Sequence, residues 1–188
     1  MKRALLALAV ACGAPPAPRG PSALVKADVA RAEAAEKARQ HDAARAAYLQ
    51  AIADAQTPAD AAYARRELAE TLISWGETRA ALDQLERAVA ARPDDAATWH
   101  DLGILRHHEG DDAGALVALE KARALVPDDP RPRIALAALR WSRGDRAGAT
   151  AEYRELLALD LPDRLRAKVQ WALDQLAKPG SVRNTPGQ

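Results

Sequence analysis

The sequence of 188 residues has one cysteine, one methionine and no phenylalanine, and aromatic side chains make up only 4% of it. A lone cysteine cannot form a disulfide within the chain, so packing alone must hold the fold. The sequence also has no glycine-rich phosphate loop, no nucleophile-elbow motif and no pair of histidines at zinc-protease spacing. Ser74 and Ser142 have no identifiable base. We therefore expect no enzymatic activity, no catalytic residue and no cofactor.

An excess of charge of one sign is also missing. The chain has 27 basic and 26 acidic residues, and the first eleven residues contain two of the basic ones, Lys2 and Arg3. Without that segment, 25 basic residues face 26 acidic ones. This balance lacks the basic footprint of a nucleic-acid-binding protein, and it predicts that any membrane attachment comes from a lipid and not from electrostatics.

Glycine, alanine and proline recur at one fixed interval of 34 residues, the distance from Gly76 to Gly110 and from Pro93 to Pro127. The full series is Gly76, Gly110 and Gly144; Ala81, Ala115 and Ala149; and Pro93 and Pro127. A period of this length indicates helix-turn-helix units, each of which buries its apolar face only by stacking on its neighbours. The composition agrees, because 48% hydrophobic residues with few aromatics favours closely packed, alanine-rich helices. We predict a solenoid whose function lies in its surface.

The clearest unit spans residues 96–129 and resembles the tetratricopeptide repeat (TPR). The residues that carry the resemblance are Trp99, Leu102, Gly103, Ala115, Leu119, Ala122 and Pro127. The small residues Gly103 and Ala115 would let the two helices of the unit approach closely. Gly110 is predicted to end the first helix in a left-handed turn, and the carboxylate of Asp111 to cap the second helix.

The same frame places further repeats at residues 62–95 and 130–163, with Arg65 and Arg133 where the best unit has Trp99. A degenerate first repeat, without the turn glycine, is predicted for residues 24–61. Residues 164–177 are predicted to form an amphipathic capping helix, whose apolar residues are Leu165, Val169, Trp171, Ala172, Leu173 and Leu176. The resemblance thus implies an all-α, right-handed superhelix of three to four repeats followed by a capping helix.

The amino terminus resembles a bacterial lipoprotein signal. Lys2 and Arg3 precede the apolar run Ala4 to Ala11, which is far shorter than the roughly 20 residues that span a bilayer, and Cys12 follows. We therefore predict a signal peptide at residues 1–11, a lipid on Cys12, a Pro- and Gly-rich tether at residues 12–23 and a flexible tail at residues 178–188. This implies an outer-membrane lipoprotein that faces the periplasm. Two alternatives remain, ordinary secretion after Ala9-Val10-Ala11 and a chance apolar terminus.

One cluster superficially resembles a metal site: His100, His107, His108, Glu109, Asp111 and Asp112. Its spacing argues against that role, because His100 and His107 would lie ~10 Å apart along a helix axis and adjacent His107 and His108 would point about 100° apart. We interpret the cluster as a solvated helix followed by a turn and an acidic cap, and we expect no metal site.

The resemblance also implies that the first helix of each repeat lines a concave groove that binds protein segments. The positions transferred to this sequence are Tyr63, Arg66, Glu70, Ile73, His100, Ile104, His107, Arg131, Ile134 and Trp141. Arg66 and Arg131 would hold a carboxylate of the partner, and Ile104, Ile134 and Trp141 would hold an apolar anchor. The chain departs from the carboxylate-clamp class of chaperone adaptors, because Glu70 and Asp101 stand where that class has asparagine.

The sequence therefore favours a lipid-anchored envelope adaptor that binds a protein partner and assists the assembly of an envelope, pilus or motility complex. Its exposed ends are also compatible with self-association. Two other hypotheses remain open. One is a soluble scaffold of the same fold, either secreted or cytoplasmic. The other is a metal- or ligand-binding enzyme that uses His100 and His107.

Overall fold

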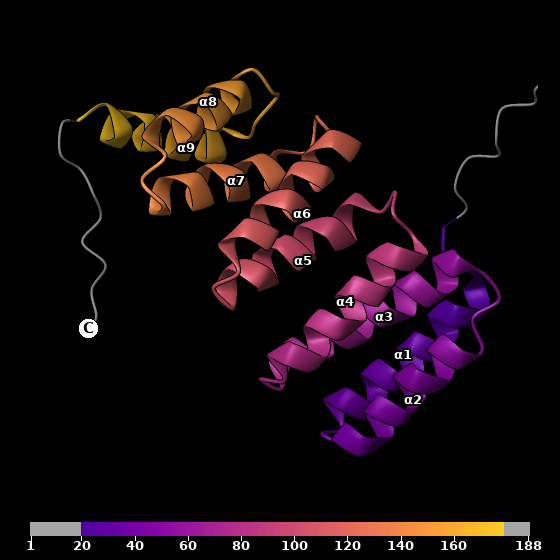
Figure 1. Ribbon diagram of the computed structural model, residues 1–188. Coiled ribbons are helices and arrows are strands. Elements are labelled where there is room, and N and C mark those ends of the chain that lie inside the picture. Colours follow the sequence, from indigo (N-terminus) through magenta and orange to yellow (C-terminus); the bar gives the residue numbers. More distant parts are fainter. Residues whose placement is uncertain (1–19, 179–188) are drawn as a thin grey trace, which may run out of the picture.

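The computed structural model describes residues 20–178, and in that range the chain has nine helices and no strand. Helices α1 to α8 form four consecutive helical hairpins that stack side by side, and α9 follows the last hairpin (Figure 1). The predicted signal peptide, Cys12 and the tail from residue 179 onward lie outside the described residues. The helices are α1 (Ala23–Lys37), α2 (His41–Ala53), α3 (Pro58–Ser74), α4 (Thr78–Ala91), α5 (Ala96–His108), α6 (Asp112–Leu125), α7 (Pro130–Ser142), α8 (Arg146–Leu157) and α9 (Asp163–Ala177).

The turn glycines behave as the sequence predicts. Gly76, Gly110 and Gly144 have φ of 79°, 83° and 81°, the left-handed region in which a side chain is strained. At each turn the N–H of the residue after the glycine donates to a carbonyl five residues earlier, as Asp111 N does to Arg106 O at 2.8 Å. The predicted cap is also present, since Asp111 Oδ1 accepts the backbone N–H of Gly114 at 2.9 Å.

The first hairpin makes the same turn without a glycine. Arg39 takes the left-handed position with φ of 58°, and Gln40 N donates to Ala35 O at 2.9 Å. The turn geometry is therefore kept in all four hairpins, although the first hairpin adopts it with a residue that disfavours this backbone conformation.

Close helix packing accounts for the small residues of the repeat. A Cβ placed on Gly103 in α5 would lie 2.6 Å from Leu119 Cγ in α6, and Ala115 is fully buried beside them. The predicted close approach at Gly103 and Ala115 is confirmed. The buried residues are mostly alanine and leucine and lie in three clusters, one across α1 to α6, one between α6 and α7, and one across α7 to α9.

Polar pairs replace tryptophan in the two other in-frame repeats. Arg65 in α3 donates to Gln84 in α4 at 2.9 Å. Arg133 in α7 donates to the buried Glu152 in α8 at 3.2 Å, and Arg123 in α6 donates to the same carboxylate. In the best-matching repeat Trp99 packs against the core. At the corresponding position the two other repeats join their two helices by a hydrogen bond or an ion pair.

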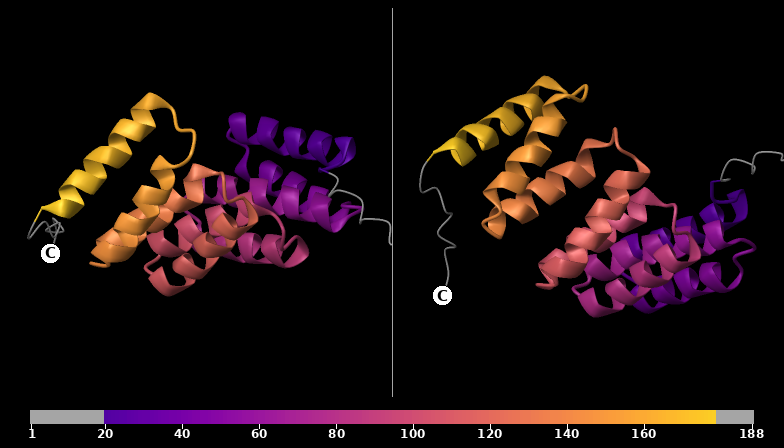
Figure 2. Two further views of the ribbon diagram at one scale, coloured as in Figure 1. Left: turned by 90° about the horizontal axis from the view of Figure 1, so that it is seen from above. Right: turned by 45° about the horizontal axis from the view of Figure 1, so that its top comes forward.

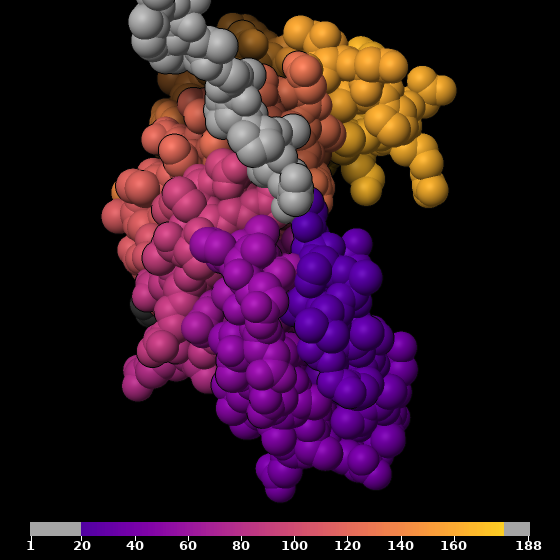
Figure 3. Space-filling view, turned by 90° about the vertical axis from the view of Figure 1, so that its right-hand side faces the viewer, coloured from indigo at the N-terminus to yellow at the C-terminus, as the bar shows by residue number. Residues whose placement is uncertain are grey.

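The stack is curved, and α9 stands apart from α7 at its end (Figure 2). The indigo α1–α2 end and the yellow α9 end project on the same side of the molecule, with a hollow between them (Figure 3). Within residues 20–178, no helix is both long and apolar enough to cross a bilayer.

Candidate binding groove

The first helices of successive hairpins form one continuous face. Thr71 and Ser74 on α3 donate to the carboxylate of Glu36 on α1, each at 3.3 Å. Arg66 Nε on α3 lies 3.5 Å from Asp101 Oδ2 on α5, and α5 in turn contacts α7. These cross-repeat contacts place α1, α3, α5 and α7 side by side, and α3, α5 and α7 are the helices that carry the predicted groove residues.

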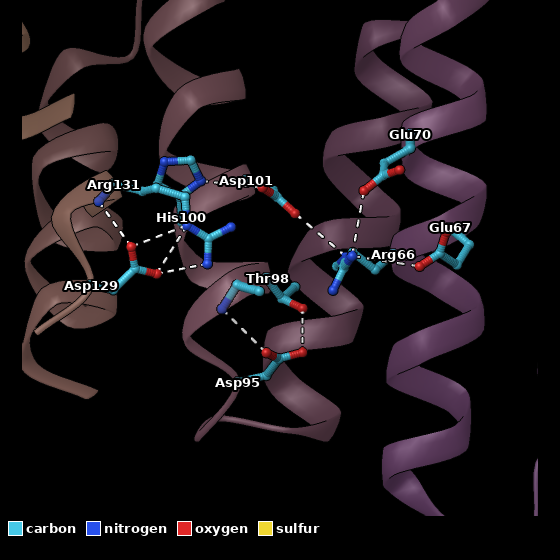
Figure 4. Close-up of polar contacts among 10 residues, drawn as sticks. Arg66, Glu67, Glu70, Asp95, Thr98, His100, Asp101, Asp129 and Arg131 are labelled. Carbon is cyan, nitrogen blue, oxygen red and sulfur yellow. Dashed lines mark hydrogen bonds and ion pairs between the residues drawn. The ribbon is translucent and has the colours of Figure 1, made fainter. Parts of the chain in front are cut away.

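The two arginines that were expected to bind a partner's carboxylate already have carboxylates of this chain (Figure 4). Arg66 lies within 3.6 Å of Glu67, Glu70 and Asp101. Arg131 donates to both oxygens of Asp129, and this bond holds the pKa of Asp129 below its ordinary value. An incoming carboxylate would have to compete with these acids at both positions, so the predicted carboxylate-binding role of Arg66 and Arg131 stays a prediction.

Glu67 is a member of this face that sequence reasoning missed. Burial raises its pKa above the ordinary value, Arg66 lowers it, and the neighbouring carboxylates of Glu70, Glu33 and Asp101 raise it further. Three carboxylates, those of Glu67, Glu70 and Asp101, thus lie within 3.6 Å of one guanidinium, and the face formed by α3 and α5 is acidic around Arg66. The contribution of Asp101 depends on its approach from the next repeat, which the local sequence around Glu67 does not show.

The histidines are separated by the fold and each lies against an acid. His100 Nδ1 is 3.2 Å from Asp101 Oδ1, and His107 Nδ1 is 2.6 Å from Asp112 Oδ1 at the α5–α6 turn. In the described part of the chain no group of three or more histidine, cysteine, aspartate or glutamate side chains is placed to hold a metal ion. The hypothesis of a metal enzyme at His100 and His107 therefore gains no support from the geometry.

Apolar side chains of the predicted groove lie open to solvent. Ile73 on α3 is 43% exposed and Ile104 on α5 is 44% exposed. Tyr63 is different, because it is half-buried against the core of the first three hairpins. Burying a fully exposed isoleucine contributes roughly 1.5–3 kcal/mol, so burying the exposed part of these two would contribute roughly half as much each.

A cleft of about 380 Å³ opens between α7 and α9. Ile134, Ala138 and Trp141 lie one or two turns apart on the face of α7 that lines it. The indole of Trp141 packs edge-on against Tyr153, with ring centroids 6.4 Å apart. The lining residues are Ile134, Ala138, Trp141, Ser142, Gly144, Arg146, Tyr153, Leu165, Lys168, Val169, Trp171 and Ala172. The structure therefore places two of the predicted anchor residues, Ile134 and Trp141, in one cleft.

Helix α9 supplies the opposite wall of this cleft, which the sequence prediction did not anticipate. Trp171 was grouped with the apolar residues of the capping helix, but it is 55% exposed. The residues that α9 buries are Val169, Ala172 and Leu176, at helical spacing, and Trp171 lies off this stripe, one turn from Lys168. The sequence signal that could have identified Trp171 as a surface residue is its position one residue before Ala172 of the buried stripe and one helical turn after Lys168.

The charged groups of the cleft are cations. Lys168 is exposed at its edge, and Arg146 donates to the carbonyl oxygens of Leu176 and Lys178 at the end of α9. Among residues 20–178 no carboxylate lines the cleft. The groove therefore has an acidic part on α3 and α5 and an apolar part with cations on its edge between α7 and α9.

Comparison with known proteins supports the fold. No protein-family model matches the chain, and no curated protein matches it. Solved structures do match. The PilF structure of Pseudomonas aeruginosa has a TM-score of 0.64 at 18% identity over 81% of this chain and 67% of that chain. MamA has a TM-score of 0.63 at 21% identity over 77% of this chain and 81% of that chain.

A third match is a complex. The type III secretion chaperone SycD of Yersinia enterocolitica, solved with a peptide of the translocator YopD, has a TM-score of 0.56 at 17% identity over 60% of this chain and 88% of that chain. Identities this low establish the architecture and leave the binding partner open. The chain is similar to these proteins in fold, and it has the all-α tetratricopeptide solenoid that its 34-residue period predicts.

Proposed function

We propose that this protein is a non-enzymatic adaptor that binds a segment of a protein partner along the face of its first helices. The observation that carries the proposal is that Ile73 and Ile104 are exposed on the first helices α3 and α5 and that an apolar cleft lies beside the next first helix, α7. Apolar side chains that are exposed on successive first helices are costly to leave in water and are typical of interaction sites. The peptide in the SycD complex is bound by a protein of similar fold, which adds support by analogy.

The groove proposal is tested by photo-crosslinking from two exposed positions of one repeat. A photoreactive residue replaces Ile104 on α5 in one variant and Val117 on α6, which is 63% exposed, in the other. In the native host we expect a protein partner to be crosslinked from position 104 and not from position 117. Equal crosslinking from both positions, or none from 104, would contradict binding in the groove.

We further propose that the adaptor is a lipoprotein of the bacterial envelope, held at the outer membrane by a lipid on Cys12, where it assists the assembly of an envelope, pilus or motility complex. The support is the basic start at Lys2 and Arg3, the apolar run that follows and the position of Cys12 after it. The proline-rich segment after Cys12 would hold the solenoid a short distance from the membrane.

Intact-mass spectrometry of the chain from the membrane fraction tests this anchor. We expect a mass that lacks residues 1–11 and carries a diacylglyceryl group, and we expect the Cys12→Ser variant to leave the membrane fraction without that mass increment. A chain that keeps Met1 and is unmodified would refute the anchor and favour the cytoplasmic scaffold. A processed chain without lipid would favour ordinary secretion.

A further inference from the structure

The two parts of the groove differ in charge as well as in polarity. The carboxylates of Glu67, Glu70 and Asp101 lie within 3.6 Å of Arg66, so three carboxylates face one guanidinium. Lys168 and Arg146 stand at the α7–α9 cleft, which in the described part of the chain has no acidic lining residue. A segment lying along the groove therefore meets a negative potential at one end and cations around an apolar recess at the other.

The recess is suited to a large apolar side chain. Ile134, Trp141 and Trp171 line it, and its volume of about 380 Å³ exceeds what a single methyl or isopropyl group would fill. Trp171 is free of any role in the core, since it is 55% exposed on a helix whose buried stripe lies elsewhere. Burying it together with a partner's side chain gives the kind of aromatic contact that dominates many interfaces.

We propose that the groove selects a segment with two features: a bulky apolar side chain that enters the cleft between Trp141 and Trp171, and lysine or arginine residues that lie against the acidic face around Glu67 and Glu70. This inference rests on the proposed function and deepens it, because it names the chemistry of the bound segment. The exposed cation of Lys168 disfavours basic residues beside the anchor, and so it helps to fix which end of the segment lies at α9.

The spacing of the two features follows from helix packing. Directly packed helices lie about 8–10 Å apart, which is a minimum for the separation of successive first helices, and the centre of the acidic face, between α3 and α5, is two first-helix steps from the cleft between α7 and α9. An extended chain covers about 3.3 Å per residue, so the basic residues should begin about six or more residues from the apolar anchor.

The test is selection from a random library of twelve-residue peptides with the full chain, followed by fluorescence anisotropy with the enriched peptides. We expect enriched peptides to carry a Trp, Phe, Leu or Met about six or more residues from a Lys or Arg. Trp171→Ala should weaken their binding by at least about tenfold, whereas the matched control Val117→Ala, on the opposite helix of another repeat, should not change it.

The basic end is tested by a double-mutant cycle. Glu70→Gln should weaken binding of a lysine-containing peptide and should have no effect when that lysine is replaced by glutamine in the peptide. The binding of the unchanged peptide should also weaken as salt is raised, because the acidic face is partly exposed to solvent.

The outcomes separate the two proposals. Binding that depends on Ile104 but not on Trp171 would overturn the cleft assignment and leave the groove standing. Binding that depends on Val117 and not on Ile104 would overturn both. Failure to enrich any peptide, or a concentration-dependent dimer that Trp171→Ala abolishes, would also overturn the inference, the latter because a second copy would then fill the cleft.

Discussion

Replacing Glu152 by glutamine tests whether an ion-pair cluster holds the last hairpin together. Glu152 on α8 is 5% exposed and binds two arginines, with Oε1 2.5 Å from Arg123 Nη1 on α6 and Oε2 3.2 Å from Arg133 Nη1 on α7. Glutamine keeps the size of the side chain and one acceptor oxygen but removes the charge. Two arginines would then face each other across three helices without a carboxylate between them.

The magnitude follows from the burial of the three groups. Removing one partner of a fully buried ion pair costs about 3–5 kcal/mol. The side chains of Arg123 and Arg133 are 31% and 16% exposed, so water can solvate part of their charge. Hydrogen bonds to charged groups are worth about 1.5–3 kcal/mol each, and one is retained in weakened form. We therefore expect Glu152→Gln to lower the free energy of unfolding by about 2–3 kcal/mol.

Urea unfolding followed by far-ultraviolet circular dichroism measures this loss. The matched control is Glu155→Gln on the exposed side of α8, for which we expect a change within about 0.5 kcal/mol. The preceding repeat has Trp99 and Ala118 at the corresponding positions, 34 residues earlier. Arg133→Trp combined with Glu152→Ala should therefore recover most of the loss. A cost below about 1 kcal/mol for Glu152→Gln would refute the assigned role of the cluster.

Two further predictions concern the turn and the acidic face. Gly110→Ala places a side chain at φ of 83° and should cost about 1–2 kcal/mol in urea unfolding, with Gly110→Asn costing less; equal stability of all three proteins would contradict the strained turn. Because burial raises the pKa of Glu67, its contribution to stability is complete below the unfolded pKa and is lost as pH rises through the folded pKa. Glu67→Gln should therefore raise the urea concentration at the unfolding midpoint at pH 7 and leave it nearly unchanged at pH 4. The exposed control Glu70→Gln should change this midpoint little at either pH. A stabilisation by Glu67→Gln that does not depend on pH would exclude ionisation of Glu67 as the cause.

Much of the repeat architecture could be predicted because its causes are local. Gly110 permits a backbone conformation that other residues avoid, Asp111 reaches the N–H of Gly114 three residues later, and Gly103 leaves the space that Leu119 fills within the same hairpin. Each of these relations spans no more than one repeat. The 34-residue period then extends them along the chain.

The candidate site was harder to predict because its partners come from other repeats. The sequence of its own helix suggested that Arg66 could bind a ligand. In the structure the carboxylate of Asp101, 35 residues later on the next first helix, lies 3.5 Å from it. Trp171 looked like a core residue because its neighbours in sequence are apolar, yet the orientation of α9 on α8 turns it outward. The periodicity of apolar residues locates the buried face of a helix only to within about one residue. It therefore could not show that Ala172 is buried and its neighbour Trp171 is exposed.

The sequence by itself determined the helical hairpins, their turns, their caps and the solenoid that they build, since these depend on short-range sterics and hydrogen bonds repeated at a fixed interval. It also determined the candidate lipid-attachment sequence at Cys12, which remains a prediction. Only the tertiary structure decided how the groove is divided, because the charge around Glu67 and the cleft between α7 and α9 each arise where separate repeats meet. The physical reason is that the electrostatic potential around Arg66 and the apolar cleft are each formed by several helices together. The relative placement of these helices is set by packing over the whole stack.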